Sequence, residues 1–326
     1  MKGFTMLYYL FSTEYEPVIT IIGTVLSFVL TLLFTHVLKQ KLPTDIGRAY
    51  AVNALAAKGK PRGAGIIFVS ISALLMLIFL PLSIEHAAYA VLLFLAMLSG
   101  FLDDASKIPW NDYKKGLIDL VISLLVAATF VLYNGTELKL LIIGTTVTLP
   151  VWLYIILGTV LVWASVNVTN CTDGVDGLSS TLSVISLAGF AYALKAMSNT
   201  GFLPAVLIFA ASIAAYLLFN ASPSILLMGD AGSRAIGVFF AICAMKSGAP
   251  LLFIPLCLVF IIDGGLGLIK VALLRFLKIR ILANTRTPIH DHVRKNKGWS
   301  DTHAVLRFAV LHAFVVFVTL YLLFSL

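Results

Sequence analysis

Carboxylate and lysine side chains meet in the segment G-F-L-D-D-A-S-K, which carries Asp103, Asp104 and Lys107. Two adjacent carboxylates at the end of an apolar run can hold Mg²⁺ or act as a base. Magnesium prefers oxygen ligands and commonly bridges carboxylates to substrate phosphates. A lysine one helical turn away can bind a phosphate. A helix cap with a solvated ion pair would explain the same residues without any chemistry.

A second polar segment, N-V-T-N-C-T-D-G-V-D-G-L, lies between two apolar runs. A simple turn needs one Asn-Gly or Asp-Gly pair, whereas this segment has four amide or carboxylate side chains. Its glycines would let the backbone approach a ligand closely. The segment therefore indicates a binding site, with these candidate residues: Asn167, Asn170, Asp173, Gly174 and Asp176.

Two further segments favour phosphate chemistry. The sequence M-G-D-A-G-S-R places Asp230 at the start of a predicted helix, where backbone N–H groups favour anions. The sequence T-P-I-H-D-H-V-R-K-N-K-G-W has His290 and His292 on either side of Asp291, followed by basic residues. No third strong ligand stands at a recognisable zinc spacing, so phosphate binding fits better. The basic segment K-G-K-P-R-G-A-G adds Lys58.

These segments sit in a chain whose composition excludes a soluble protein. Of 326 residues, 60% are hydrophobic and only 12% are charged, whereas soluble domains have about a quarter charged residues. Apolar runs of about 17–25 residues predict membrane helices. We therefore predict an all-α integral membrane protein, a single polytopic domain over 1–326 with a small β-hairpin on the outer face near 134–149. The ten predicted helices are 17–38, 63–83, 86–102, 116–133, 150–169, 177–197, 202–220, 231–247, 250–274 and 305–325.

Charge placement predicts an orientation. Nineteen of the 23 basic residues fall in alternate connections that contain the polar segments, and all eleven aspartates lie there or in helices nearby. Because positive loops stay in the cytoplasm, we expect a cytoplasmic cleft and both termini outside. The net charge of +8 then reflects loops beside an anionic leaflet rather than a nucleic-acid partner.

Taken in order, the four segments resemble the polyprenyl-phosphate N-acetylhexosamine-1-phosphate transferase superfamily. Its marks are a DDxxK-type loop, an NxxNxxDGxDGL loop, a GDxGS loop and a His-rich last cytoplasmic loop on ten helices. Within it the chain looks most like the phospho-N-acetylmuramoyl-pentapeptide transferase family. The segment G-K-P-R-G-A-G is similar to that family's G-T-P-T-M-G-G, and P-I-H-D-H with a later G-W and R-F is close to P-x-H-H-H…G-W…R-F. Asp291 departs from the pattern because it replaces the middle histidine.

The resemblance implies a reaction and its partners. Undecaprenyl phosphate, a membrane lipid, would attack the β-phosphate of UDP-MurNAc-pentapeptide, either directly or through a covalent enzyme intermediate, giving lipid I and UMP for peptidoglycan synthesis. The enzyme would use Mg²⁺ and would lie in the bacterial cytoplasmic membrane, with its active site on the cytoplasmic face. A homodimer is possible, and no nucleic acid is implied.

The resemblance also implies roles for individual residues. Asp230 would be the first Mg²⁺ ligand, together with Asp103 and Asp173. Asp103 would hold or deprotonate the lipid phosphate with Asp104 in support, and Lys107 and Lys115 would stabilise diphosphate charge. The remaining substrate contacts would come from Lys58, Asn167, Asn170, Gly174, Asp176, Asn220, His290 and His292, with His290 also placed among the catalytic residues.

Two alternatives stay open at this stage. A sister transferase would use UDP-GlcNAc or another UDP-N-acetylhexosamine with the same lipid phosphate. A non-enzymatic transporter is a more distant alternative, because it would place acids across the membrane with broken helices at the midplane. The acids of this chain gather at one face instead.

Overall fold

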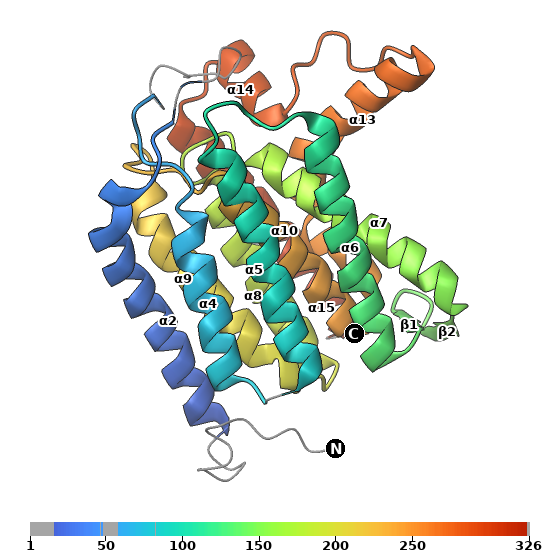
Figure 1. The fold of residues 1–326 in the computed structure, drawn as a ribbon. Coiled ribbons are helices and arrows are strands. Elements are labelled where there is room, and N and C mark those ends of the chain that lie inside the picture. The colour runs from blue at the N-terminus through green and yellow to red at the C-terminus, as the bar shows by residue number, and fades with distance from the viewer. Residues whose placement is uncertain (1–15, 46, 48–57, 82, 325–326) are drawn as a thin grey trace.

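The computed structural model describes residues 16–45, 47, 58–81 and 83–324. This part of the chain is mostly helical, and its long helices run side by side in one bundle (Figure 1). The predicted outer placement of the termini concerns residues 1–15 and 325–326, which lie outside the described residues.

The first half of the chain forms four helices and a hairpin. The helices are α2 (Glu16–Leu38), α4 (Gly65–Phe79), α5 (Ile84–Asp104) and α6 (Asp112–Asn134), with a short 3₁₀ turn at Lys39–Lys41. Ser83 caps α5 by accepting a hydrogen bond from the backbone N–H of His86, and Asn111 caps α6 through Lys114. Strands β1 (Glu137–Leu140) and β2 (Thr145–Thr148) pair antiparallel, which confirms a hairpin within 134–149.

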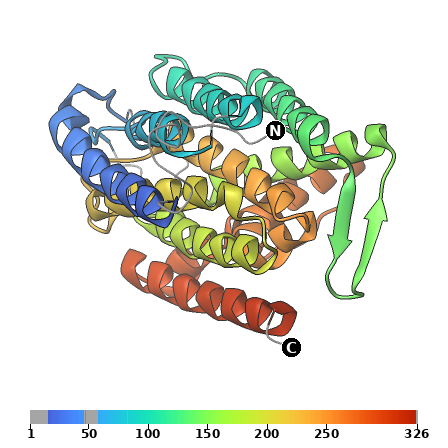
Figure 2. The same cartoon turned by 90° about the horizontal axis from the view of Figure 1, so that it is seen from below.

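Helix α10 (Gly229–Lys246) forms the centre of the second half. Every residue of α10 is buried, and the helix packs against α4, α5, α7 (Val151–Thr172) and α8 (Leu178–Ala196). Helices α9 (Leu203–Asn220) and α15 (Asp301–Phe324) complete the bundle, with 3₁₀ turn η3 (Thr200–Phe202) leading into α9. Figure 2 shows α15 along one edge of the bundle and the hairpin projecting beyond another.

The predicted run 250–274 is helical but bent. Its parts are η4 (Pro250–Leu252), α11 (Phe253–Leu256), α12 (Leu258–Phe260), the π-helical η5 (Ile261–Gly265), α13 (Leu266–Ala272) and the π-helical η6 (Leu273–Leu277). The two halves meet at 72°. The break lies at Cys257, which leaves the helical conformation (φ −125°, ψ 22°), and π-helical turns, a usual companion of sharp kinks, follow it at η5.

Seven helices are long and apolar enough to cross a membrane, or eight if the bent pair counts as one span, among the described residues. Each of the ten predicted ranges contains helix. Two of the ten predicted ranges are not among these spans. One contains α4, which has only 15 residues, and the other contains α10, which includes three charged residues. The chain is therefore a mostly helical membrane protein.

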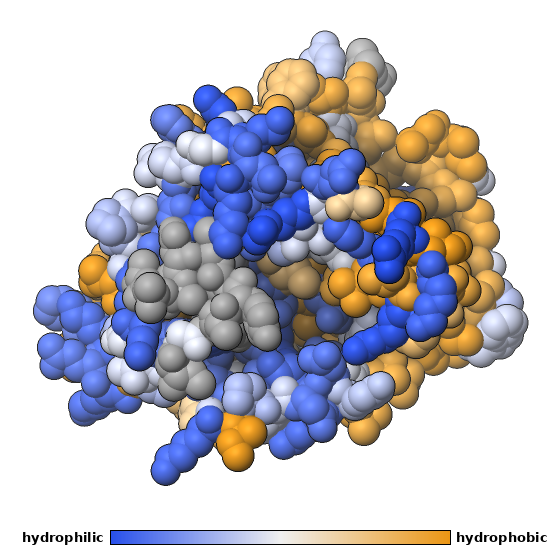
Figure 3. Space-filling model, turned by 90° about the horizontal axis from the view of Figure 1, so that it is seen from above, coloured by the Kyte–Doolittle hydropathy of each residue, from blue (hydrophilic) through white to orange (hydrophobic). Residues whose placement is uncertain are grey.

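The predicted His loop contains a short helix, α14 (Ile289–Lys297), that the apolar pattern does not reveal. It lies at the same end of the bundle as the C-terminal ends of α5 and α7 (Figure 1). Seen from that end, the molecule has a largely hydrophilic centre with hydrophobic surface along one side (Figure 3). We call this end the polar end.

Candidate active site

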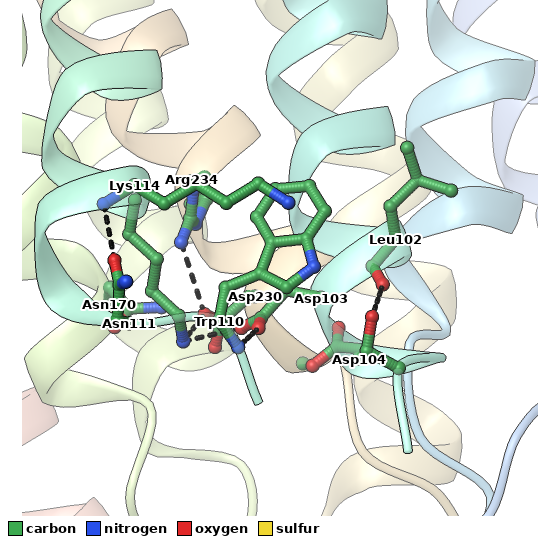
Figure 4. A network of polar contacts seen from close by, with 12 residues as sticks. Leu102, Asp103, Asp104, Trp110, Asn111, Lys114, Asn170, Asp230 and Arg234 are labelled. Atoms are coloured by element: carbon green, nitrogen blue, oxygen red, sulfur yellow. Dashed lines mark hydrogen bonds and ion pairs between the residues drawn. The ribbon is translucent and has the colours of Figure 1, made fainter. Parts of the chain in front are cut away.

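A partly buried network of ion pairs lies at the polar end, with the buried Asp230 at its centre. Arg62, Lys115 and Arg234 approach the Asp230 carboxylate at 3.4, 3.3 and 3.4 Å. Lys115 also pairs with Asp103. Figure 4 shows Asp103, Asp230 and Arg234 close together near the indole of Trp110.

We call this network the Asp230 cluster. It joins residues from helices and loops that are far apart in the sequence, and its members are Asp45, Arg62, Asp103, Asp104, Lys115, Asp119, Asp230 and Arg234.

Helix ends bring the predicted residues Asp103, Asp104 and Asp230 into this cluster. Asp103 and Asp104 are the last residues of α5, and Asp230 is the second residue of α10. Asp103 also accepts a hydrogen bond from the backbone N–H of Trp110 at 2.8 Å. The turn before Asp230 needs Gly229, which has φ +69° and where a Cβ would overlap an Asp104 oxygen.

Asp104 is fixed by Arg62, a residue that the sequence pattern did not single out. The Nε of Arg62 donates to Asp104 Oδ1 at 2.7 Å, and Nη1 donates to Asp45 at 2.8 Å. The other Asp104 oxygen accepts from the backbone N–H of Ala231. Burial alone would lower the pKa of Arg62, but the carboxylates of Asp104 and Asp230 outweigh it and raise this pKa. The guanidinium therefore stays charged.

Asp119 and Arg234 form a second pair that the sequence pattern missed. Arg234 Nη1 donates to Asp119 Oδ1 at 3.0 Å, and both side chains are buried. Asp119 lies one helical turn after Lys115 on α6, while Arg234 lies one turn after Asp230 on α10. Charged residues four positions apart within an apolar run were the available sequence signal.

Lys107 lies outside the cluster, although it belongs to the D-D-x-x-K segment. Its side chain is exposed in the loop after α5, and no ion pair involves it among the described residues. Nearby, the ammonium group of Lys114 lies over the ring of Trp110, 3.5 Å from the ring centroid (Figure 4). Lys115, rather than Lys107, makes contact with the carboxylates.

The end of α7 carries the predicted amides beside α10. Asn170 donates to Ser233 Oγ at 2.9 Å, and Asp173 caps α7 three residues later. Asn167 is half-buried and donates to the Trp163 carbonyl within the same helix. The hydrogen bond from Asn170 joins this second polar segment to the helix of Asp230.

His290 is held firmly against the loop that follows α7. Its backbone N–H and its Nδ1 both meet the buried carboxylate of Asp263 at 2.7 Å. The other ring nitrogen, Nε2, faces the loop. A Cβ at Gly174 would overlap this Nε2. Asp263 therefore orients His290 from the π-helical η5.

The other residues of the His loop face different partners. Asp291 pairs with Arg294 at 3.5 Å and lies 3.7 Å from His290 Nε2. The Nδ1 of His292 accepts a hydrogen bond from the backbone N–H of Arg286. Lys58 is exposed in the loop before α4.

Asp176 and Asn220 support the loops around the site. Asp176 accepts from the backbone N–H of Ser224 at 2.9 Å and pairs with Lys60 at 3.3 Å. Asn220 is buried, where it accepts from the Gly177 N–H and donates to the Leu226 carbonyl. These contacts hold the segment after α9 against the segment after α7.

The donor set of the Asp230 cluster fits Mg²⁺ shared with a phosphate. Asp103 and Asp230 each direct an oxygen to the Lys115 ammonium, so both carboxylates converge on one cationic centre. With every group of the cluster charged, five carboxylates face three cations. No group of three or more His, Cys, Asp or Glu in the described part of the chain is arranged to hold a metal ion. Magnesium needs only one or two carboxylates when substrate phosphates supply further oxygens.

An apolar groove of about 670 Å³ runs along the outside of the bundle beside this site. Its walls come from the hairpin, α7 and the bent segment 250–277. The lining includes Leu138, Leu157, Val168, Ile254, Ile261 and Leu268. Val168 lies two residues before Asn170, and the lining residue Gly265 lies two after Asp263. The same two elements therefore line the groove and carry site residues.

Comparison with known proteins shows the family of the chain. A family model for glycosyl transferase family 4 matches residues 86–248. The phospho-N-acetylmuramoyl-pentapeptide-transferase of Treponema pallidum (strain Nichols) is 38% identical over 87% of this chain and 84% of its own length. The protein of that name from Thermoanaerobacter sp. (strain X514) is 26% identical over 92% of this chain and 98% of its own length. This chain belongs to glycosyl transferase family 4 and is similar to these phospho-N-acetylmuramoyl-pentapeptide-transferases.

Proposed function

We propose that this protein transfers phospho-MurNAc-pentapeptide from UDP-MurNAc-pentapeptide to undecaprenyl phosphate and releases UMP. The names of its relatives support phospho-MurNAc-pentapeptide as the transferred group. The observation that carries the proposal is the Asp230 cluster, where carboxylates and cations converge at a polar end beside an apolar groove. A charged nucleotide and a long lipid require those two environments at one site.

The proposed transfer is a displacement at phosphorus. An oxygen of the lipid phosphate forms a bond to the β-phosphorus, and the bond from that phosphorus to the oxygen shared with the α-phosphorus breaks. UMP leaves with the bonding electrons, and the product is lipid I. Such reactions depend mainly on positioning and on neutralising phosphate charge.

The residues of the site have distinct roles in this proposal. Lys115 neutralises phosphate charge, while Asp103 orients Lys115 and accepts any proton left on the attacking phosphate. Asp230, with Asp103 and Asp173, would hold Mg²⁺, which supplies further neutralisation and orientation of the diphosphate. His290 offers Nε2 to the sugar or phosphate beside Gly174.

Further substrate contacts come from the loops. Asn167 and Asn170 line the diphosphate region at the end of α7, while Asp176 and Gly174 contact the nucleoside with Asn220 bracing their loop. Lys107, Lys58 and His292 contact the substrate from the rim of the site.

The lipid enters from the side of the bundle. The groove between α7 and the bent segment is apolar along its length, and exposed residues such as Leu157 and Ile254 open it toward the bilayer. The polyprenyl chain lies there and its phosphate reaches the cluster. We place this single-domain protein in the bacterial cytoplasmic membrane, with the polar end in the cytoplasm.

A transfer assay tests the proposal directly. Purified protein in detergent would receive undecaprenyl phosphate, Mg²⁺ and either radiolabelled UDP-MurNAc-pentapeptide or radiolabelled UDP-GlcNAc. We expect labelled lipid from the first donor only, with release of UMP and loss of activity in excess EDTA. Labelled lipid from UDP-GlcNAc alone would show that the chain is a sister transferase.

A further inference from the structure

The side chain of Arg62 contacts three carboxylates at once. Nε donates to Asp104 at 2.7 Å and Nη1 donates to Asp45 at 2.8 Å, while Nη2 lies 3.4 Å from Asp230. The three acids belong to different parts of the chain, because Asp45 follows α2, Asp104 ends α5 and Asp230 begins α10. Arg62 therefore joins the loop after α2 to the centre of the site.

The three contacts are unequal. The bonds to Asp104 and Asp45 have the length of strong charge-assisted hydrogen bonds, and the contact with Asp230 is longer. The backbone around Arg62 is also fixed, since its N–H donates to the Pro43 carbonyl and the Leu227 N–H donates to the Pro61 carbonyl. The Nη2 contact with Asp230 is thus the one that can open while the rest of the side chain stays in place.

A divalent ion on Asp230 would lie beside this Nη2, and the two positive charges would repel each other. The repulsion ends if Nη2 turns to an anionic oxygen instead. A nucleoside diphosphate bound at the same centre offers such oxygens, and the planar guanidinium suits phosphate recognition. Arg62 stands where the pattern G-T-P-T-M-G-G has its second threonine, so the motif itself does not account for this cation.

We propose that Arg62 is a positioning residue that couples divalent-ion binding to diphosphate binding. It holds Asp230 while the site is empty, and it transfers its Nη2 hydrogen bond to the diphosphate when Asp230 takes a metal ion. Asp45 and Asp104 keep the guanidinium in place during this exchange. The inference rests on the proposed function, because it takes the diphosphate of a UDP-sugar as the ligand.

The test measures binding without sugar transfer. Mn²⁺ affinity would be measured by electron paramagnetic resonance on purified protein in detergent, and UDP affinity by calorimetry with and without Mn²⁺. Without UDP, Arg62→Gln should bind Mn²⁺ about tenfold more tightly, because it removes a positive charge next to Asp230. In the wild type, Mn²⁺ should increase the affinity for UDP. In Arg62→Gln this increase should be at least about fivefold smaller, because Arg62 no longer couples Mn²⁺ binding to UDP binding.

Two further variants make the test specific. Asp45→Asn removes an acid that neutralises Arg62 and keeps its guanidinium in place, so it should weaken Mn²⁺ binding in the wild-type background. In the Arg62→Gln background the same change should have much less effect, because Asp45 acts through Arg62. Arg62→Lys keeps the positive charge, so its Mn²⁺ affinity should be closer to that of the wild type. This variant serves as the control if Arg62→Gln folds poorly.

A merely structural role for Arg62 gives a different pattern. Disorder of the site would weaken Mn²⁺ and UDP binding together in Arg62→Gln, and that result would overturn the proposal. Unchanged Mn²⁺ affinity in Arg62→Gln, or no Mn²⁺ binding by the wild type, would also overturn it. Failure to use UDP-MurNAc-pentapeptide in the transfer assay would concern the proposed function alone, since these measurements use Mn²⁺ and UDP.

Discussion

Asp230 is buried among three cations. Removing a charge from water is costly, and the cost is recovered only when partners surround it. Arg62, Lys115 and Arg234 supply those partners from the loop before α4, from α6 and from α10. The cluster should therefore be sensitive to the loss of any single charge.

The Asp119–Arg234 pair tests this sensitivity. Arg234→Met should leave Asp119 buried without its guanidinium and destabilise the protein by about 3–5 kcal/mol, the typical cost of breaking a buried pair. Asp119→Leu should also lower the stability of the protein, because it leaves Arg234 buried without its carboxylate partner. Thermal unfolding in detergent would measure both effects.

The double variant provides the control. Asp119→Leu with Arg234→Met removes both charges, so its stability should recover toward wild type. Its transfer activity should stay low, because Arg234 also contacts Asp230. Single variants as stable as wild type would show that this pair contributes little.

Lys115 and Lys107 make a matched comparison. Lys115→Ala should lower kcat by about 100-fold, since it removes a fixed charge that stabilises the transferring phosphate. Lys107→Ala should mainly raise KM, because its side chain is exposed at the rim. Steady-state kinetics with UDP-MurNAc-pentapeptide would separate the two effects. Equal losses of kcat would contradict the distinction between a lysine at the reacting phosphate and a lysine at the rim.

Sequence reasoning found those members of the site that lie in short motifs. Asp103, Asp104 and Asp230 could be predicted because each stands with other polar residues at the end of an apolar run. Asp45 and Asp119 were missed, because each is a single acid outside the polar segments and only the four-residue spacing from Lys115 marked Asp119. Their importance comes from partners on other helices or loops, and such pairing depends on packing.

At the scale of elements, the bent segment 250–277 determines where Asp263 lies. Its break leaves carbonyl groups without their usual partners, and in a membrane such groups must be satisfied within the protein. Ser186 of α8 donates to the Leu256 carbonyl at 2.7 Å, and His312 Nε2 of α15 lies 2.8 Å from the same Ser186 oxygen. Two neighbouring helices thus stabilise the bend.

Ser186→Ala should weaken this bend. We expect a loss of about 1–2 kcal/mol in stability, the range found for hydrogen bonds between membrane helices, measured as a lower unfolding temperature in detergent. Ser183→Ala is the matched control, because Ser183 is also buried on α8 but donates to Ser179 in its own helix. An equal loss in both variants would remove the argument for a special role of Ser186.

The helices were easier to predict than their irregularities. A membrane fixes the length and apolarity of a span, so continuous runs such as 150–169 predicted α7 well. The break at Cys257 was not predicted, because apolar composition alone predicted a continuous run through it. The short α14 was missed because it is polar and lies outside any apolar run.

At the scale of the whole molecule, charge divides the two ends of the bundle. The Asp230 cluster and α14 lie at the polar end, and the hairpin lies at the other (Figure 1). At the hairpin end Lys246 pairs with Glu85 at 2.8 Å, and it also donates to Asn134. One of the few basic residues there is thus neutralised, which increases the contrast between the two ends.

This contrast predicts the orientation of the protein in the membrane. Nineteen of the 23 basic residues fall in the sequence connections that contain the polar segments, so the positive-inside rule predicts that these connections face the cytoplasm. Single cysteines would be introduced at the exposed positions Asn296 of α14 and Thr146 of β2, in a chain lacking Cys171, Cys243 and Cys257. In intact cells an impermeant thiol reagent should label Thr146→Cys and leave Asn296→Cys unlabelled until the membrane is opened. The opposite pattern would place the nucleotide site outside the cell, where the proposed UDP-sugar donor is not made.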